Sequence, residues 1–213
     1  EVCENATSRD VVINLKGAHA LTPRTLRGSS TRVGAQSTRV LIRGDGATLI
    51  TRDVSATVGA DTPLLTIADG AVVLLAGIVL EGAVLVHSGH LDIRDAVLRR
   101  SAAAAGRRLQ DGTHDGAQLQ LLGGATTLSG CTIVGLAPGS GSAITMHGGT
   151  LAIDGSTFRS NRASTDGGAI LLTGGELRLS GSLFEANAAT LSGGAIAMRG
   201  GSATLLASRF VSN

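Results

Sequence analysis

Apolar residues in the C-terminal half of the chain stand two positions apart, in short runs that end at glycine. Ile170/Leu172 runs into Gly-Gly and Leu177/Leu179 runs into Ser-Gly. A period of two is typical of β-strands, and glycine pairs between short runs predict tight turns. Apart from the short run Ala102–Ala105, no stretch has a convincing helical period. The pattern therefore predicts many short strands separated by turns.

The same pattern recurs along the chain as a repeated unit. Residues 175–200 repeat residues 149–174, and a partial third copy begins at Gly201. Residues 124–135 match the first half of this unit, and residues 82–100 match the later copies in the same order. Short strands cannot bury a face alone, so the units are expected to stack at the spacing of neighbouring strands, about 4.8 Å.

Aligning the copies produces four apolar columns that we expect to point inward and to stack from coil to coil. These columns are Leu128/Ile153/Leu179/Leu205, Ile133/Phe158/Phe184/Phe210, Leu119/Ile144/Ile170/Ile196 and Leu121/Met146/Leu172/Met198.

The predicted fold is all-β: a right-handed, single-stranded parallel β-helix (β-solenoid) of about eight coils of roughly 19–26 residues. Residues 1–213 are expected to form one domain, with degenerate coils in 1–81 and clear repeats in 82–213. A loop near 99–115 lengthens one coil by about ten residues. A leucine-rich repeat would need a Leu/Asn consensus that is missing, and a β-sandwich would have more aromatic residues.

Composition narrows the function classes. Hydrophobic residues make up 43% and aromatic residues only 1%, so the core is expected to be a regular stack of small aliphatic side chains. The 18 basic and 16 acidic residues nearly balance, which argues against a nucleic-acid partner. No apolar run reaches the roughly 18–20 residues of a membrane helix, so we expect a soluble module without direct membrane insertion.

The chain start favours a processed protein, and its two cysteines are too few for a disulfide scaffold and lack metal-ligand spacing. The first residue is Glu1 rather than Met, which indicates processing or a longer precursor. Asn5 begins a glycosylation sequon that permits a secretory route. We expect Cys3 and Cys131 not to be bonded to each other, because the intervening coils separate them by roughly 20 Å, too far for a disulfide.

Two short motifs, GGAI and FxxN, alternate in the last repeats. Their residues are Gly167, Gly168, Ala169, Ile170, Gly193, Gly194, Ala195 and Ile196 for GGAI, and Phe158, Asn161, Phe184, Asn187, Phe210 and Asn213 for FxxN. The pair resembles the repeats of the polymorphic outer membrane proteins of Chlamydia and of similar algal and protist surface proteins. The resemblance is clear over 149–213 and degenerate back to about residue 82. It implies a right-handed β-helix at the cell surface with a role in adhesion.

The motif residues themselves suit structural roles. Glycines accept positive φ at turns, and asparagines tolerate left-handed conformations and bond to nearby backbone or to one another as a ladder. The phenylalanines are expected to stack inside the solenoid. A role for the motifs as receptor contacts would require at least the asparagine side chains to be exposed.

A catalytic groove on a solenoid needs acidic groups aligned on neighbouring coils. Asp154 aligns with serines, Asp166 aligns with Ser192, and Glu185 aligns with Arg159. No acidic column survives, so we expect no catalytic residues, no cofactor and no metal site in the repeats.

Other acidic residues lie in loops and turns. Asp111, His114 and Asp115 stand together in the inserted loop, which is either a metal or ligand site or a solvated insertion. Asp45 and Asp69 stand in Asp-Gly turns, where aspartates most often cap backbone groups.

Two function classes remain open from the sequence. The first is a non-catalytic extracellular module, an adhesive or filament-forming part of a cell-surface protein. The second is a polysaccharide-active β-helix, a lyase or glycosidase whose site lies in the N-terminal coils or outside this sequence. The expected partners are a cell-surface receptor, further copies, or further coils at the C-terminal end. We expect the native protein to continue past Asn213, because the third copy stops before its GGAI half.

Overall fold

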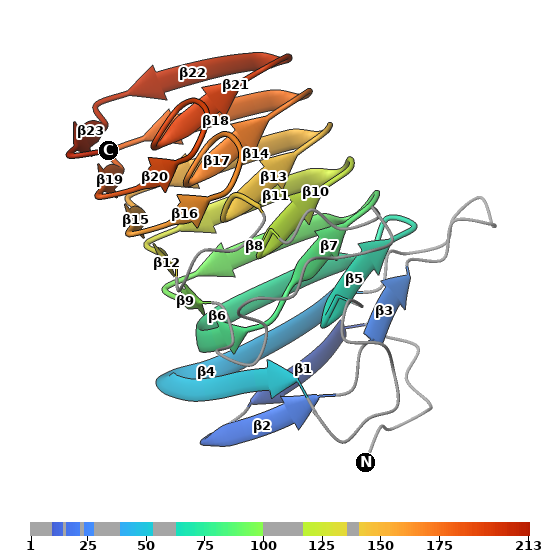
Figure 1. The fold of residues 1–213 in the computed structure, drawn as a ribbon. Coiled ribbons are helices and arrows are strands. Elements are labelled where there is room, and N and C mark those ends of the chain that lie inside the picture. Colours follow the sequence, from blue (N-terminus) through green and yellow to red (C-terminus); the bar gives the residue numbers. More distant parts are fainter. Residues whose placement is uncertain are drawn as a thin grey trace.

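The computed structural model describes residues 10–14, 16–21, 24–27, 39–52, 63–99, 117–135 and 141–213. Every regular element within these ranges is a β-strand, and every strand pairing is parallel (Figure 1). The first strands are β1 (Asp10–Asn14), β2 (Ala18–Leu21), β3 (Arg24–Arg27), β4 (Arg39–Arg52), β5 (Leu65–Ala68), β6 (Val72–Glu81), β7 (Val84–Val86), β8 (His90–Arg94), β9 (Val97–Arg99), β10 (Leu119–Leu121), β11 (Ala125–Ser129) and β12 (Thr132–Val134). The remaining strands are β13 (Ile144–Met146), β14 (Thr150–Asp154), β15 (Thr157–Arg159), β16 (Arg162–Ala163), β17 (Ile170–Leu172), β18 (Glu176–Ser180), β19 (Leu183–Glu185), β20 (Ala188–Ala189), β21 (Ile196–Met198), β22 (Ser202–Leu206) and β23 (Arg209–Val211).

Each strand pairs with the equivalent strand of the next coil. A coil such as β11, β12 and β13 contributes one strand to each of three faces, and the following coil repeats the order with β14, β15 and β17. The first face reads β1, β4, β6, β8, β11, β14, β18 and β22, one strand per level and eight levels among the described strands. The second face ends in β12, β15, β19 and β23, and the third in β10, β13, β17 and β21. The parallel stacking of equivalent strands on all three faces confirms the predicted parallel β-helix.

The large, 14-stranded sheet forms both the first and the second face. It can do so because β4 and β6 continue from one face into the other, whereas later coils break at the same place into two strands. The break falls on a residue with positive φ, namely Asp95, Gly130, Gly155, Gly181 and Ala207 in successive coils. The left-handed conformation turns the chain between the first and second faces.

The register confirms the predicted columns in the C-terminal coils. Leu128 pairs with Ile153, which pairs with Leu179, so these coils have almost the same length. The step from Ile93 to its partner Leu128 is longer, which agrees with the predicted lengthening of this coil by about ten residues.

The N-terminal coils depart from the predicted length of roughly 19–26 residues. Ile42 pairs with Leu75, a step longer than this range, and Leu75 pairs with Ile93, a step slightly shorter than it. One cause is an irregularity in β4, where the register advances from Arg43 to Thr48 while the partner strand advances by far less. Such a bulge adds residues to a strand without adding a level.

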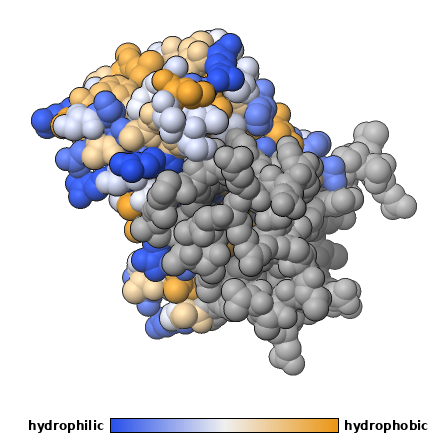
Figure 2. Space-filling model, viewed as in Figure 1, coloured by the Kyte–Doolittle hydropathy of each residue, from blue (hydrophilic) through white to orange (hydrophobic). Residues whose placement is uncertain are grey.

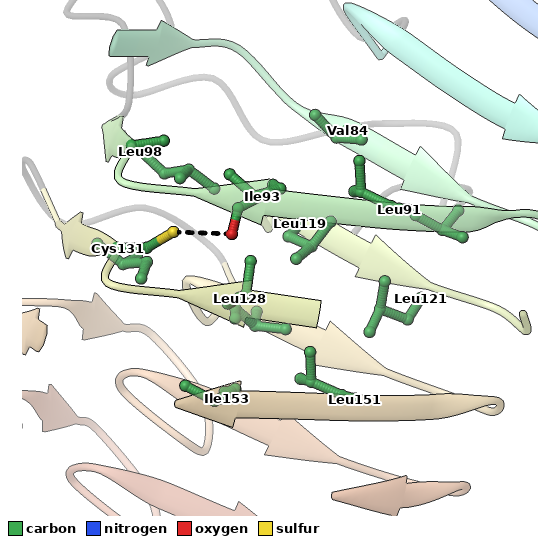
Figure 3. Packing of buried hydrophobic residues seen from close by; sticks show 14 of the residues in the cluster. Val84, Leu91, Ile93, Leu98, Leu119, Leu121, Leu128, Cys131, Leu151 and Ile153 are labelled. Carbon is green, nitrogen blue, oxygen red and sulfur yellow. Dashed lines mark hydrogen bonds between the residues drawn. The ribbon is translucent and has the colours of Figure 1, made fainter. Parts of the chain in front are cut away.

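The core is a continuous stack of aliphatic side chains. One buried cluster extends from Ile50 to Ala195, and its members alternate with outward residues along each strand. Figure 3 shows part of it, with Ile93, Leu128 and Ile153 above one another on successive strands of the first face. Because each coil places a similar side chain at the same position, the interior fills without large aromatic residues.

Pairs of glycines make the turn from the third face back to the first face. In Gly123-Gly124, Gly148-Gly149, Gly174-Gly175 and Gly200-Gly201, the second residue has positive φ. A Cβ on Gly149 would lie 2.3 Å from the carbonyl oxygen of Gly124 in the coil before it. These turns therefore stack backbone against backbone, at a separation that only glycine permits.

Within the described residues, no helix has the length and apolar character needed to cross a membrane.

Candidate functional site: the FxxN and GGAI repeat

The phenylalanines of the FxxN motif form a stack inside the solenoid. Phe158 and Phe184 are fully buried, and their ring centroids lie 4.6 Å apart with nearly parallel planes. The ring of Phe210 stacks on that of Phe184 with centroids 4.9 Å apart. Parallel strands in register place these rings face to face, and each ring covers the one below it.

The asparagines of the FxxN motif form a hydrogen-bonded ladder. The Oδ1 atom of Asn187 accepts hydrogen bonds from the backbone N–H of Asn161 at 3.0 Å and from its Nδ2 at 2.8 Å. The Oδ1 atom of Asn213 likewise accepts hydrogen bonds from the backbone N–H of Asn187 at 3.0 Å and from its Nδ2 at 2.8 Å. Asn161 and Asn187 are each only 1% exposed. Buried in this way, the two side chains connect one coil to the next and are not receptor contacts.

Each asparagine also bonds within the interior of the preceding turn. Nδ2 of Asn187 donates to the carbonyl of Phe158, and Nδ2 of Asn161 donates to the carbonyl of Ile133. The remaining amide proton of Asn161 and of Asn187 is donated to the next asparagine, so the side chain of Asn187 is bonded to both the preceding and the following coil. Buried polar groups must be paired in this way if they are not to destabilise the fold.

The left-handed conformation expected for these asparagines belongs to the residue before them. Ser160, Ala186 and Ser212 have φ values of 54°, 53° and 51°, whereas Asn161, Asn187 and Asn213 have negative φ. The expectation that the asparagines adopt the left-handed conformation was therefore wrong by one position. The asparagine side chain forms the ladder, and the residue before it, a serine or an alanine, carries the backbone strain of the left-handed conformation.

The two glycines of GGAI have different functions. Gly167 has a φ of 63°, and a Cβ there would lie 2.2 Å from the carbonyl oxygen of Ile170. Gly168 does not need positive φ, but its Cβ would lie 2.1 Å from the carbonyl oxygen of Gly194 in the next coil. The first glycine makes the turn, and the second permits close stacking of turns.

Ala169 and Ile170 complete the motif as core residues, and both are fully buried. In the next coil Gly193 has the same φ of 63°, Gly194 takes the stacking position, and Ala195 is again buried. Ile196 is paired with Ile170 but is only partly buried. The phenylalanine and asparagine side chains of the first two FxxN copies, and the alanines of both GGAI copies, thus face the interior or a neighbouring coil.

A second ladder, made of serines, was not recognised as such from the sequence. The hydroxyl of Ser156 accepts a hydrogen bond from the backbone N–H of Cys131 at 3.1 Å. In the same way, the hydroxyl of Ser182 accepts from the N–H of Ser156 at 3.1 Å, and the hydroxyl of Ser208 accepts from the N–H of Ser182 at 3.3 Å. Each hydroxyl donates to the carbonyl two residues before it. The alignment of Cys131 with these serines was visible, and the small polar residue at a constant spacing was the available signal.

Cys131 is a free, buried cysteine at the N-terminal side of this ladder. Its Sγ lies 3.3 Å from the carbonyl oxygen of Ile93, the contact drawn in Figure 3. Burial raises the pKa of the Cys131 thiol, so the reactive thiolate is disfavoured. Cys131 acts as a small apolar residue of the core.

The carboxylates considered for catalysis are held by arginines or hydroxyl groups. Asp154 accepts from the hydroxyl of Ser180 at 2.8 Å, and Glu185 forms an ion pair with Arg159 at 2.8 Å. The side chain of Asp166 is 5% exposed and pairs with the guanidinium of Arg199. That pairing was not predicted, because Arg199 stands in a different column of the repeat.

Pairs of this kind recur on other coils, as in Asp92–Arg94, Glu81–Arg99 and Glu176–Arg178. Partial burial alone would raise the pKa of Asp92, but hydrogen bonds from Arg94 and Thr127 outweigh it and lower that pKa. Within the described ranges, no group of three or more His, Cys, Asp or Glu residues could hold a metal ion.

Asp45 has the capping role predicted for it. Its Oδ1 accepts from the hydroxyl of Thr48 at 2.7 Å and from the backbone N–H of Ala47 at 3.2 Å, and the Thr48 bond is the main cause of its lowered pKa. Asp69 has a φ of 53°, and its backbone N–H donates to the hydroxyl of Ser88. Residues Cys3, Asn5, Asp111, His114 and Asp115 lie outside the described residues.

A small cavity lies beside Asn161, at the N-terminal side of the asparagine ladder. Its volume is about 20 Å³, and Gln118, Ser142 and Arg162 contribute to its lining. Among the residues that the structure describes, Oδ1 of Asn161 is buried without a hydrogen-bond partner. A volume of this size accommodates one water molecule.

The outer surface differs among the three faces. On the third face, Gln120 and Thr145 occupy outward positions of β10 and β13 but are 7% and 0% exposed. That part of the third face is therefore not available to a partner. On the first face the outward positions of β14 and β18 are accessible. On the side of the C-terminal coils seen in Figure 2, hydrophilic and apolar residues are interspersed.

A comparison with known protein families bears on the C-terminal repeat. Residues 155–173 match the family model of the Chlamydia polymorphic membrane protein (Chlamydia_PMP) repeat. This segment is similar to a PMP repeat. It extends from the turn before Phe158, through Asn161 and the GGAI residues, to the end of β17. The family resemblance drawn from the two motifs is thereby confirmed for this coil.

The same motifs recur one coil later around Phe184 and Gly193, in the same structural positions. No curated protein and no solved structure gives a significant match to the chain. The described residues thus form a parallel β-solenoid, of which residues 155–173 are similar to a PMP repeat.

Proposed function

We propose that this chain is a non-catalytic, extracellular module of a cell-surface protein, in which the stacked coils form a stiff support and the outward side chains contact a partner. The observation that carries the proposal is the inward placement of the motif residues. The repeat contributes its phenylalanines, asparagines and glycines to the stack, so only the outward positions remain for recognition.

Those outward positions change from coil to coil while the inward ones do not. The outward column Arg94, Ser129, Asp154, Ser180, Leu206 runs beside the inward column Ile93, Leu128, Ile153, Leu179, Leu205. A surface that differs at every level suits recognition of a particular protein or glycan. It does not suit a ligand that repeats along the axis.

The chemistry of the described carboxylates also favours a role in binding. Catalysis by a β-helix would need two free carboxylates facing one substrate, or several around Ca²⁺. Glu81, Asp92 and Glu185 are each bonded to an arginine. A carboxylate fixed by a neutralising arginine is a poor general acid or base.

The proposal is tested by attachment. Beads coated with the folded chain are applied to cultured cells, and beads coated with heat-denatured chain are the control. We expect attachment of the folded chain above the control. A triple variant, Arg94→Ala/Asp154→Ala/Arg178→Ala, should lower attachment, because it removes charges from the first face without touching the interior.

The competing enzymatic function is tested on the same preparation. Polysaccharide substrates are incubated with the chain, with and without Ca²⁺, and released ends are measured. Release above background would contradict the non-catalytic proposal. Attachment equal to that of the denatured control would contradict the adhesive part.

A further inference from the structure

The first face of the solenoid presents a flat, accessible surface in the middle of the described chain. Strands β8, β11, β14 and β18 have five residues each and lie side by side in register (Figure 1). Each strand points its first, third and fifth side chains outward, and all of these positions are half-buried or exposed. The outward positions of these four strands are called the first-face patch below.

The first-face patch has its ion pairs at its two ends, in opposite order along the columns. In β8, Asp92 of the middle column pairs with Arg94. In β18, the middle column has Arg178, which pairs with Glu176 of the first column at 2.8 Å. The first column of β8 has His90, opposite in character to Glu176. Between these two strands, β11 and β14 have only Ala, Thr, Ser and one Asp at outward positions.

A second copy of the chain can meet this pattern with its complement. A two-fold axis parallel to the strands, placed between β11 and β14, keeps each column opposite itself and reverses the order of the strands. Strand β8 of one copy then faces β18 of the other, and β11 faces β14. The polar pairs that face each other are Asp92/Arg178, His90/Glu176 and Ser129/Asp154, each occurring twice. Each remaining pair places an alanine or a serine opposite a longer side chain, so the two surfaces interlock.

The ion pairs within each chain leave groups for these contacts. Arg178 donates from Nε to Oε1 of Glu176 and contacts the same oxygen through Nη2, so other N–H groups of this 71% exposed side chain remain for a partner. Asp92 accepts from Arg94 through Oδ2 and from the hydroxyl of Thr127 through Oδ1, which has a second lone pair. A second copy would therefore add charges of opposite sign without breaking either pair.

Other ways to cover the first-face patch fit its charges less well. A two-fold axis along the solenoid would place Asp92 opposite Asp92 and Arg178 opposite Arg178, and like charges that face each other disfavour association. A strongly acidic or strongly basic partner would meet charges of both signs at each end of the patch. The reversed order of charges in β8 and β18 thus selects one partner and one orientation.

We propose that the first-face patch docks onto the same patch of a second copy of this chain, with the strands parallel and the solenoid axes antiparallel. From strand rise and spacing the patch covers roughly 300 Å² per copy, well below the about 800 Å² per partner of a stable complex, so this dimer is transient. The inference goes beyond the proposed function, because it needs no partner other than the chain itself. Since the dimer covers Arg94, Asp154 and Arg178, it competes with attachment through these side chains.

The test is sedimentation of the native chain and of two charge reversals, up to millimolar concentration. We expect a monomer–dimer equilibrium for the native chain. Asp92→Arg and Arg178→Asp should each weaken dimerisation by about 10-fold or more, because each places like charges opposite one another at both ends of the patch. An equimolar mixture of the two variants should return to within about 3-fold of the native affinity, because reversed charges face each other at one end and the native pair remains at the other.

The matched controls are Glu185→Arg and Arg159→Asp, which break an ion pair on the second face with the same changes of charge. We expect both to dimerise as the native chain does. Circular dichroism checks the fold of every variant. A measurement without variants is NMR of the native chain during dilution, where amide shifts should change in β8, β11, β14 and β18 and stay constant in β15 and β19.

The proposal is overturned by a native chain that stays monomeric, by single reversals that dimerise like the native chain, or by a mixture that associates no better than either variant alone. Dilution shifts confined to strands of another face would also overturn it. Sedimentation and dilution use only the chain, whereas the attachment assay uses cells, so failure of the dimer is distinguishable from failure of the proposed function.

Discussion

The coil of Phe184 and the coil of Phe210 place the same residue types in the same columns, but their environments differ. Phe184, Ser182 and Asn187 have a coil on each side, and each is 2% exposed or less. Phe210 is 45% exposed, and among the described residues its ring stacks on Phe184 of the preceding coil alone. A motif residue therefore contributes to stability through its neighbours on both sides, as expected when repeats interact only with adjacent repeats. The following predictions compare the two levels.

The largest difference is expected for the phenylalanines. Phe184→Ala should lower the free energy of unfolding by about 3–5 kcal/mol, because it leaves a cavity between two rings. Phe210→Ala should cost only about 1–2 kcal/mol, because its ring is half exposed already. Urea unfolding followed by circular dichroism measures both. Equal losses would contradict the two-neighbour account.

Gly168→Ala should lower the free energy of unfolding by about 3 kcal/mol, because the new Cβ would overlap the backbone of the next coil. The control is Gly155→Ala, where φ is 53° but no atom lies within 4 Å of the new Cβ. That change should cost about 1 kcal/mol of backbone strain. If both variants lose the same amount, inter-coil contact at Gly168 is not the cause.

Asn187→Ala should cost about 2–3 kcal/mol, because it leaves the buried N–H and Nδ2 of Asn161 without an acceptor. Asn213→Ala removes the equivalent acceptor from Asn187, but at the end of the stack water can replace it, and about 1 kcal/mol is expected. The urea midpoints of the two variants provide the comparison. A larger loss at Asn213 would reverse the predicted order.

The C-terminal coils were easier to predict from the sequence than the N-terminal coils. The columns of the C-terminal coils were predictable because Leu128, Ile153 and Leu179 repeat at nearly constant spacing. The columns of the coils before Ile93 were not predictable, because the bulge after Arg43 changes the spacing along the sequence without changing the number of coils. A register irregularity of this kind has no periodic signal.

The candidate site was predicted in part for a similar reason. Inward placement of Phe158 and Asn161 follows from strand alternation and from their recurrence. The shift of positive φ from Asn161 to Ser160 does not, because serine has no strong preference for that conformation. The Asp166–Arg199 pair joins different columns, so no alignment of repeats could reveal it.

The smallest effect on the free energy of unfolding is expected from relief of backbone strain. Its size should be the same in the coil of Phe184 and in the coil of Phe210. Ala186→Gly and Ser212→Gly each place glycine at a φ near 50° on the surface. Each should stabilise by about 0.5 kcal/mol, because relief of left-handed strain slightly exceeds the entropy lost by glycine. Thermal unfolding of both variants is the measurement. A gain at only one level would indicate that this strain depends on the neighbouring coil.

Native-state hydrogen exchange at the three ladder asparagines tests most directly whether the FxxN motif joins coils. The backbone amides of Asn161 and Asn187 should exchange about 1,000-fold or more slowly than the amide of Asn213, because only the first two are bonded to a following coil. Rapid exchange at Asn161 and Asn187, at rates close to that of Asn213, would show that these residues are open to solvent and would contradict the account.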